Sequence, residues 1–313
     1  MMKWAKLGIL MVACCLAGNS AQALSLGTAG NYNVFVYGNY VGSNSDVQGR
    51  LAAGGNVTLK NYGVGEKLPT NSGNVLLAGG NLTYANGQIN NGNAVTGGNA
   101  TLTGVGVPNG DVTEGTRVPV DFSAEWNYLT SLSSGLSQMP ATGTTSSPWS
   151  GALLFQGDNT SRLQVFDISG SDLSSANTFS FLNDTTMISD DATLIFNISG
   201  TSVEMGNFDM AAFMNLLGES WDNVLFNFYE AETLNLYNIG IYGSILAPLA
   251  DITAGYGQIN GTVIANSWTG TMQVNNKPFD GDMPPAPVPE PATILLLGSG
   301  LLGLMGTARK KRG

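Results

Sequence analysis

A Gly-Gly-Asn-x-Thr motif recurs in the first third of the chain and constrains the fold more than any other feature. It occurs as AAGGNVTL at 52–59, LAGGNLTY at 77–84 and VTGGNATL at 95–102. The step from Gly54 to Gly79 is longer than the step from Gly79 to Gly97, which indicates one repeat with an inserted loop. Gly243 and Gly261 keep the same separation as Gly79 and Gly97, and GQIN occurs at 87–90 and 257–260.

A fixed period of about 18 residues, built of short alternating strands divided by Gly and Asn, predicts a β-solenoid. The expected fold is mainly β, with three faces of about six residues in each rung and Val, Leu and Ile stacked inside. Ile89 and Ile259, in the two GQIN copies, are expected to point inward in one continuous core. A β-sandwich whose hairpins carry Gly-Asn turns is the alternative.

The segment after VPVDF departs from the repeat and predicts an amphipathic helix over about 121–139, capped by Asp121 and stopped by Pro140. We expect this helix to lie along the solenoid and cover an open flank. Strands are expected at LQVFDIS, TLIFNIS and NVLFNFY and a short helix at 208–217, so that 121–240 lies alongside or between the two groups of rungs. The apolar stripe of the first helix consists of Phe122, Trp126, Leu129, Leu132, Leu136 and Met139.

Charge and the missing side chains limit the chemistry. Only 12 cations face 22 carboxylates, and half of those cations lie in the two terminal segments. Such an acidic body argues against a nucleic-acid partner. The chain has no His, and its two cysteines, Cys14 and Cys15, lie in the N-terminal apolar run. Removal of that run would exclude Cys–His or Ser–His catalysis and thiolate or imidazole zinc sites.

Residues 1–23 are typical of a secretory signal peptide. Lys3 and Lys6 precede an apolar stretch from Leu7 to Ala17, and Ala21 and Ala23 form the small-x-small signal of the cleavage site. The expected partners are the Sec export machinery and signal peptidase. An uncleaved N-terminal anchor is the alternative, although the apolar run is short for a membrane span.

The tail, 288–313, resembles the PEP-CTERM sorting signal of Gram-negative bacteria. Its parts are Val288-Pro289-Glu290-Pro291, an apolar segment 292–308 that predicts a single transmembrane helix, and a basic stop. The resemblance implies an exosortase-type membrane peptidase as partner, with transient inner-membrane anchoring before transfer to the cell surface or outside. A permanent C-terminal anchor is the alternative. The basic stop consists of Arg309, Lys310, Lys311 and Arg312.

The body, 24–280, resembles a choice-of-anchor A domain, and 281–287 reads as a Pro-rich linker. The resemblance rests on the opening LGTAGNYNVFVYGNYVGSNSDVQGRLAAGG, on the helix after VPVDF and on GSILAPLADIT with GQINGTVIAN. It implies one extracellular domain attached to a surface-anchoring signal and no established catalytic activity. The opening also resembles ice-binding-type β-solenoids, more faintly.

The acidic residues that could act in catalysis are better explained by structural roles. Glu230 and Glu232 are two apart on an expected strand and would share one face, as a glycosidase pair could; an exposed acidic strand edge is the simpler interpretation. Asp190 and Asp191 read as a turn. No Asp-x-Asp-x-Asp loop is present, although acids at rung turns could hold a structural calcium. No catalytic residue, cofactor or metal ligand is therefore assigned.

Thr58, Thr83 and Thr101 follow Gly-Gly-Asn-x in each repeat and could stack into an outward ladder. Flat threonine arrays suit ice or crystalline sugar surfaces, but threonine is also an ordinary outward strand residue. The sequence favours a non-enzymatic cell-surface or extracellular-matrix protein associated with exopolysaccharide. An adhesin for polysaccharide or ice is the alternative, and a polysaccharide-acting enzyme is disfavoured by the scarcity of cations.

Overall fold

The computed structural model describes residues 25–158, 160–182, 188–189, 192–210 and 220–283. These residues fall in one compact unit, Ala23–Pro284. The predicted signal peptide, the sorting signal with its transmembrane helix, the pair Asp190–Asp191 and most of the short helix predicted at 208–217 lie outside the described residues. Among the described residues, no helix is both long and apolar enough to span a bilayer.

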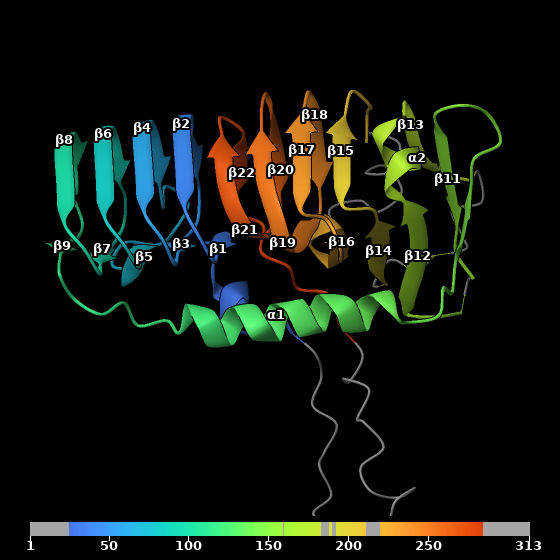
Figure 1. Ribbon diagram of the computed structural model, residues 1–313, viewed down its shortest axis with the longest axis horizontal. Coiled ribbons are helices and arrows are strands. Elements are labelled where there is room, and N and C mark those ends of the chain that lie inside the picture. Colours follow the sequence, from blue (N-terminus) through green and yellow to red (C-terminus); the bar gives the residue numbers. More distant parts are fainter. Residues whose placement is uncertain (1–24, 159, 183–187, 190–191, 211–219, 284–313) are drawn as a thin grey trace, which may run out of the picture. The chain divides into compact units, whose positions relative to one another are not determined.

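The fold is a β-solenoid with three faces, in which neighbouring rungs pair through parallel strands (Figure 1). Face A contains β12 (Leu163–Ser169), β14 (Thr193–Ser199), β16 (Val224–Phe228), β1 (Val34–Val36), β3 (Leu51–Ala53), β5 (Asn74–Ala78), β7 (Asn93–Thr96) and β9 (Val112–Thr113). Face B contains β15 (Ser202–Gly206), β17 (Thr233–Tyr237) and β8 (Ala100–Gly106). Face C contains β18 (Ile239–Tyr242), β20 (Gly257–Asn260) and β22 (Gln273–Asn275).

The longer strands turn a corner and belong to two faces. β19 (Ser244–Ala254) and β21 (Val263–Gly270) run from face A to face B, whereas β2 (Tyr40–Val47), β4 (Val57–Val64) and β6 (Leu82–Ile89) run from face B to face C, as β8 also does. The parallel register of these pairings shows that the sandwich alternative is wrong. Ile89 and Ile259 are both fully buried in one hydrophobic cluster, which confirms the prediction of a single continuous core.

The order of the rungs in space is not their order in the chain. β1 and β2 begin in the middle of the stack, and the next rungs extend from there to one end at β8 and β9 (Figure 1). After α1, the chain starts again at the opposite end and builds back until β21 pairs with β1 and β2. The strands β12, β14, β15, β16 and β17 therefore supply rungs of the same solenoid, and the helix α1 lies alongside it.

The Gly-Gly-Asn motif forms the corner between faces A and B. A Cβ built on Gly79 would lie 2.1 Å from the carbonyl oxygen of Gly54, and one on Gly97 would lie 2.2 Å from that of Gly79. Each Asn then accepts a hydrogen bond from the corner of the next rung: the backbone N–H of Asn81 reaches Asn56 Oδ1 at 2.8 Å. The motif recurs because only Gly permits this approach.

The helix α1 (Phe122–Ser137) runs along face A, as predicted, and Asp121 Oδ1 accepts the backbone N–H of Ala124 at 3.0 Å as its N-cap (Figure 1). Face A is thus apolar on both sides, because its outward residues pack under the helix. That second cluster contains Phe122, Leu129, Leu132 and Leu136 of α1 and Phe35, Ala52, Leu77, Val165, Ile195, Leu225, Leu246 and Ile264 of face A.

The two ends of the stack differ. At the end formed by the middle of the chain, β10 (Thr144–Ser146), β11 (Ala152–Gln156) and β13 (Thr178–Phe181) form a separate small sheet beside α2 (Gly170–Ser174). Stacked rings continue the core into this end, with Phe166 and Phe196 centred 5.1 Å apart. Short 3₁₀ segments, η1 (Gly27–Asn31) and η3 (Ser220–Asn223), precede β1 and β16.

Candidate functional site

A row of threonines crosses face B, on a part of the solenoid that is exposed to solvent. The predicted ladder is confirmed in geometry, since Thr58 pairs with Thr83 and Thr83 with Thr101 on adjacent strands. All three side chains are exposed. Neighbouring strands lie about 4.8 Å apart, so that spacing recurs along the row.

The same row continues across the join between the two halves of the chain. Val41 pairs with Thr58 on one side and with Thr269 on the other, and Thr269 pairs with Thr253. All of these are exposed, and Val41, like Thr, presents a methyl group. The complete row therefore covers six consecutive strands: Thr253, Thr269, Val41, Thr58, Thr83 and Thr101.

Sequence reasoning missed the Thr253–Thr269 part of the row because β19 contains a bulge. Ala247 pairs with Ala265 at the separation of the repeat, whereas Asp251 pairs with Ser267, which is closer in the chain. An unchanged separation aligns Thr253 with Thr271 instead. The Pro248 that lies between the two registers was the available signal for a bulge.

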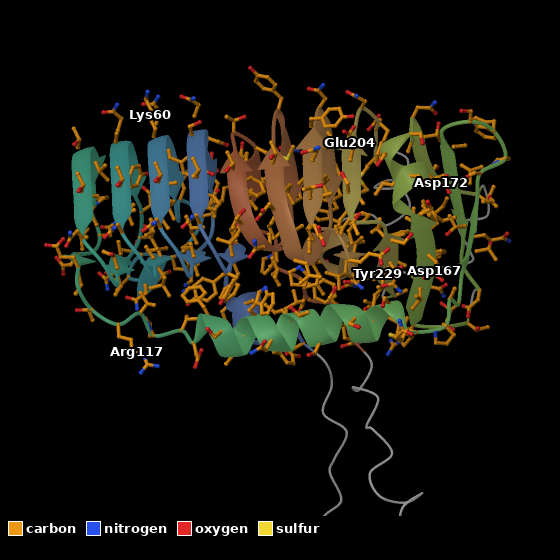
Figure 2. The ribbon with its side chains drawn as sticks, in the orientation of Figure 1. Lys60, Arg117, Asp167, Asp172, Glu204 and Tyr229 are labelled. Carbon is orange, nitrogen blue, oxygen red and sulfur yellow. The ribbon has the colours of Figure 1, made fainter. Side chains whose placement is uncertain are left out.

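Charged side chains lie beside the row and at one of its ends on face B. Lys60 lies between Ser43 and Ala85 in the neighbouring outward row of face B. Glu204 and Asn235 continue the threonine row toward the end of the stack that the middle of the chain forms. Figure 2 shows Lys60 and Glu204 on the half of the solenoid away from α1. Tyr237 donates to Glu204 Oε2 at 3.0 Å, and this hydrogen bond raises the pKa of the Tyr237 hydroxyl.

Hydrogen-bonded ladders keep face B regular at its corners. Asn44, Asn61 and Asn86 all adopt positive φ at the corner between faces B and C, where Asn is tolerated in place of Gly. Asn61 Nδ2 donates to Asn44 Oδ1 at 2.9 Å, and Asn86 Nδ2 donates to Asn61 Oδ1 at 3.4 Å. Each rung therefore takes its orientation from its neighbour.

Below the row, buried tyrosines connect the rungs through their hydroxyl groups. The hydroxyls of Tyr40 and Tyr62 lie 2.7 Å apart, and Tyr84 Oη donates to the carbonyl oxygen of Tyr62 at 2.5 Å. Burial raises the pKa of Tyr84 to about 12 and raises the pKa values of Tyr40 and Tyr62 well above the ordinary value. These three side chains stay protonated and hold the sheet from inside.

The structure corrects the acidic pair. Glu230 and Glu232 lie in the turn between β16 and β17, not on a strand, so the expectation that they share a strand face is wrong. Glu230 Oε1 accepts the backbone N–H of Gly200 at 2.6 Å, which ties two neighbouring turns together. Within the described residues, no group of three or more acidic or soft ligands is placed to hold a metal ion.

A parallel β-solenoid with one face covered by a helix and another left open is a scaffold that presents an extended surface. The chain belongs to the family described as "Putative Ice-binding-like adhesive domain", whose model matches residues 25–276. The PEP-CTERM protein-sorting motif matches residues 287–311. That motif implies export, processing by an exosortase and sorting through the membrane toward the cell surface or the extracellular space.

Several solved structures are similar to the chain. An ice-binding protein from the Antarctic ascomycete Antarctomyces psychrotrophicus is 14% identical, with a TM-score of 0.38 over 82% of this chain and 100% of that one. A glycosylated ice-binding protein from Arctic yeast is 13% identical, with a TM-score of 0.40 over 85% and 96%. An ice-binding protein domain of Shewanella frigidimarina is 12% identical, with a TM-score of 0.38 over 82% and 96%. No curated protein matches the chain.

Proposed function

We propose that this chain is an exported, non-enzymatic surface adhesin that binds a repetitive polysaccharide through face B. The observation that carries the proposal is the outward row from Thr253 to Thr101, which repeats one side-chain type on neighbouring strands with a single valine among them. Each threonine presents a hydroxyl, which donates and accepts, and a methyl group that is easily dehydrated. Many weak contacts at a fixed spacing add up to firm attachment.

The charges on face B favour a hydrated polysaccharide over ice. Lys60 carries a strongly hydrated ammonium on a flexible stem beside the row, and Glu204 lies at its end. A flat plane of ice would have to remove the water of hydration from both charged groups or accommodate it. A glycan chain can bend and hydrogen-bond to them. Ice remains the second candidate, because the threonine row is regular and the family is named for ice-binding-like domains.

The proposed location is the cell surface or the extracellular matrix, reached through Sec export and exosortase processing. The signals that support this route are Ala21 and Ala23 at one end and Pro289-Glu290-Pro291 with the basic stop at the other. Exopolysaccharide made by the same cell is the proposed partner, and a structural role in that matrix follows from adhesion to it. Membership of the choice-of-anchor A group is part of the same proposal.

The test is sedimentation of residues 23–284 with insoluble polysaccharides and with ice. Thr83→Arg places a long cation in the middle of the row, and Gln88→Arg places the same side chain on face C of the same strand, β6. We expect Thr83→Arg to lower the bound fraction about tenfold and Gln88→Arg to leave it unchanged. Equal binding by both variants would overturn the role of face B.

Product release from the same glycans tests the non-enzymatic part of the proposal. The double variant Glu230→Gln, Glu232→Gln should bind as the parent does, because both carboxylates lie in a turn. Neither protein should release reducing sugar. Release by the parent and its loss in the double variant would identify an enzyme instead.

A further inference from the structure

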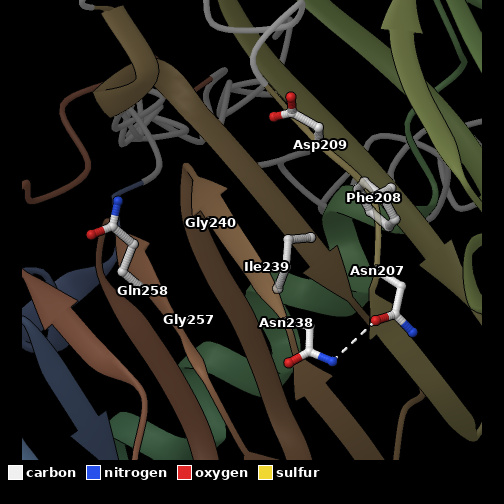
Figure 3. A pocket seen from close by; sticks show the side chains of 8 residues that line it. All are labelled: Asn207, Phe208, Asp209, Asn238, Ile239, Gly240, Gly257 and Gln258. Atoms are coloured by element: carbon white, nitrogen blue, oxygen red, sulfur yellow. Dashed lines mark hydrogen bonds between the residues drawn. The ribbon is translucent and has the colours of Figure 1, made fainter.

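A shallow hollow of about 590 Å³ lies at the corner between faces B and C. It is in the half of the stack that is built after α1. Its volume is within the range of small-molecule sites. The hollow lies at the ends of β15 and β17 and at the starts of β18 and β20 (Figure 3). Its lining residues are Asn207, Phe208, Asp209, Asn238, Ile239, Gly240, Gly257 and Gln258.

The polar rim of the hollow offers both donors and acceptors. Asn238 Nδ2 donates to Asn207 Oδ1 at 3.1 Å, which leaves the carbonyl oxygen of Asn238 and the amide nitrogen of Asn207 at the two outer ends of the pair (Figure 3). Asp209 and Gln258 add a carboxylate and a third amide. A row of this kind matches hydroxyl groups, each of which donates and accepts. None of the residues that line the hollow is a cation, which disfavours phosphate ligands.

The floor of the hollow is apolar and fixed. Phe208 is buried and stacks on Phe179, with ring centroids 5.6 Å apart and planes 12° apart. Ile239 is buried beside it. A Cβ built on Gly257 would lie 2.1 Å from the carbonyl oxygen of Ile239, so glycine is required for this close approach of the two backbones. The base of the hollow is therefore formed by packed side chains and by closely spaced backbone.

An aromatic ring lies next to this hollow in the chain. Tyr256 immediately precedes Gly257 and is 81% exposed, the most exposed of the large apolar or aromatic side chains among the described residues. A folded protein normally covers such a ring, since a tyrosine can bury roughly 150–250 Å² in a contact. Tyr256 precedes Gly257 as Asn238 precedes Ile239, and Gly257 and Ile239 are register partners, so Tyr256 continues the corner row to which Asn238 belongs. An exposed aromatic ring in that row suits a ligand with one apolar face and a polar edge.

We propose that this hollow, together with Tyr256 on the adjoining corner, is a binding subsite for one or two neutral hexopyranose units of a polysaccharide chain. A pyranose ring presents C–H groups on its faces, which stack on an aromatic ring, and hydroxyls at its edge, which bond to the amides and the carboxylate. The inference rests on the proposed function and names a second contact for it. Face B holds an extended surface, and the corner hollow selects the sugar.

The test uses the exported protein as its host releases it, and isothermal titration with soluble hexasaccharides. The probes are glucose hexamers with β-1,4, β-1,3 and α-1,4 linkages and a β-1,4 hexamer of N-acetylglucosamine. We expect at least one to bind and Tyr256→Ala to weaken it about tenfold. Tyr256→Phe should bind within about twofold of the parent, because the ring and not its hydroxyl makes the contact.

Gly240→Val supplies a variant that does not depend on the tyrosine. A Cβ at Gly240 meets nothing closer than Tyr242 at 3.5 Å, so valine fits the strand and fills part of the hollow. This variant should also lose the hexasaccharide, whereas Trp149→Ala, at another exposed aromatic residue, should not. No heat with any hexamer, or binding that both substitutions leave unchanged, overturns the subsite.

The outcome separates this inference from the role of face B. Thr83→Arg should leave hexasaccharide binding intact, because Thr83 is on β6 and the hollow is on β15, β17, β18 and β20. If sedimentation with insoluble polysaccharide depends on Thr83 and no hexamer binds, the subsite is wrong and the adhesive face stands. If hexamers bind and the sedimented fraction does not depend on Thr83, the subsite stands and the adhesive role of face B is wrong.

Discussion

The rings of Tyr40 and Trp268 stack inside the solenoid, with centroids 5.9 Å apart and planes 8° apart. Tyr40 begins β2 and Trp268 lies in β21, so the contact joins residues from opposite ends of the folded chain. The two residues are also partners in the backbone register between these strands. The halves of the molecule are therefore closed in the middle of the stack by backbone pairing and by a pair of large rings.

Trp268→Ala should destabilise the protein by about 3–5 kcal/mol. The side chain is fully buried, and its removal leaves a cavity where the two halves meet. Urea unfolding followed by far-UV circular dichroism measures the loss. Trp149→Ala is the control, because that ring is 56% exposed, and it should change the free energy of unfolding by less than about 0.5 kcal/mol. Similar losses in the two variants would contradict a closing role for Trp268.

The solenoid and its helix were predictable because both depend on short-range patterns. The repeat has its period because Gly79 stacks on Gly54 and Gly97 stacks on Gly79 in successive rungs. The apolar stripe of α1 records its packing on face A. The join at Tyr40 and Trp268 leaves no such record, since no repeat unit spans residues so far apart in the sequence. The sequence therefore did not predict that the first and the last strands of the folded chain pair with each other in the middle of the stack.

The buried polar contacts under α1 were equally invisible in the sequence. Asn227 Nδ2 donates to Asn197 Oδ1 at 2.8 Å and to the carbonyl oxygen of Ser133 at 2.9 Å, and Ser133 Oγ donates to Asn227 Oδ1 at 2.6 Å. Asn in an apolar strand such as VLFNF indicates a buried amide but does not name its partner. Burial makes such a network stabilising only when each group is paired.

Gly79→Ala should destabilise the solenoid by about 1–3 kcal/mol, because its Cβ would lie 2.1 Å from the carbonyl oxygen of Gly54 and force two rungs apart. Gly135→Ala is the matched control. Gly135 is in α1, a Cβ there meets nothing within 4 Å, and alanine is the better helix former by about 1 kcal/mol. Thermal melting should thus move in opposite directions for the two variants. A stabilised Gly79→Ala would refute the account of the repeat.

The buried tyrosines predict a loss of stability at alkaline pH. The folded state raises the pKa of Tyr40, Tyr62 and Tyr84 above the ordinary value of 10.0, so their contribution is fully present below about pH 10. Above that pH the unfolded chain ionises these groups while the folded chain does not, and stability falls, through about pH 12 for Tyr84. Melting temperatures from pH 7 to 12, with tyrosinate absorbance as a second signal, test this window.

Tyr256→Phe serves as the control for that titration. Its ring is 81% exposed, so removing its hydroxyl should leave the alkaline midpoint of unfolding unchanged. Tyr62→Phe should reduce the steepness of the alkaline loss, because one buried hydroxyl no longer contributes. It should also lower stability at pH 7, where it breaks the hydroxyl contact with Tyr40. An alkaline profile that is identical in the parent and Tyr62→Phe would contradict the assignment.

The sorting signal predicts a cut beyond the folded unit. Pro289 and Pro291 disfavour helix for the residues that precede them, so an extended strip beside an apolar segment is expected, and a membrane peptidase can grip such a strip. Met283, the last described residue, is 5% exposed and belongs to the cluster under α1. Removal of 292–313 should therefore leave the stability of the solenoid unchanged.

Replacement of Pro289, Glu290 and Pro291 by Ala should keep the full-length chain in the inner membrane, because the expected grip for the peptidase is lost. Replacement of Pro284 and Pro285 by Ala is the control, since it removes two prolines from the linker and leaves the motif intact. Intact mass of the surface-released protein decides the question: the parent and the linker variant should lack 292–313. A released species that still carries Arg309 to Arg312 would mean that the tail is a permanent anchor and that the basic cluster holds it in place after sorting.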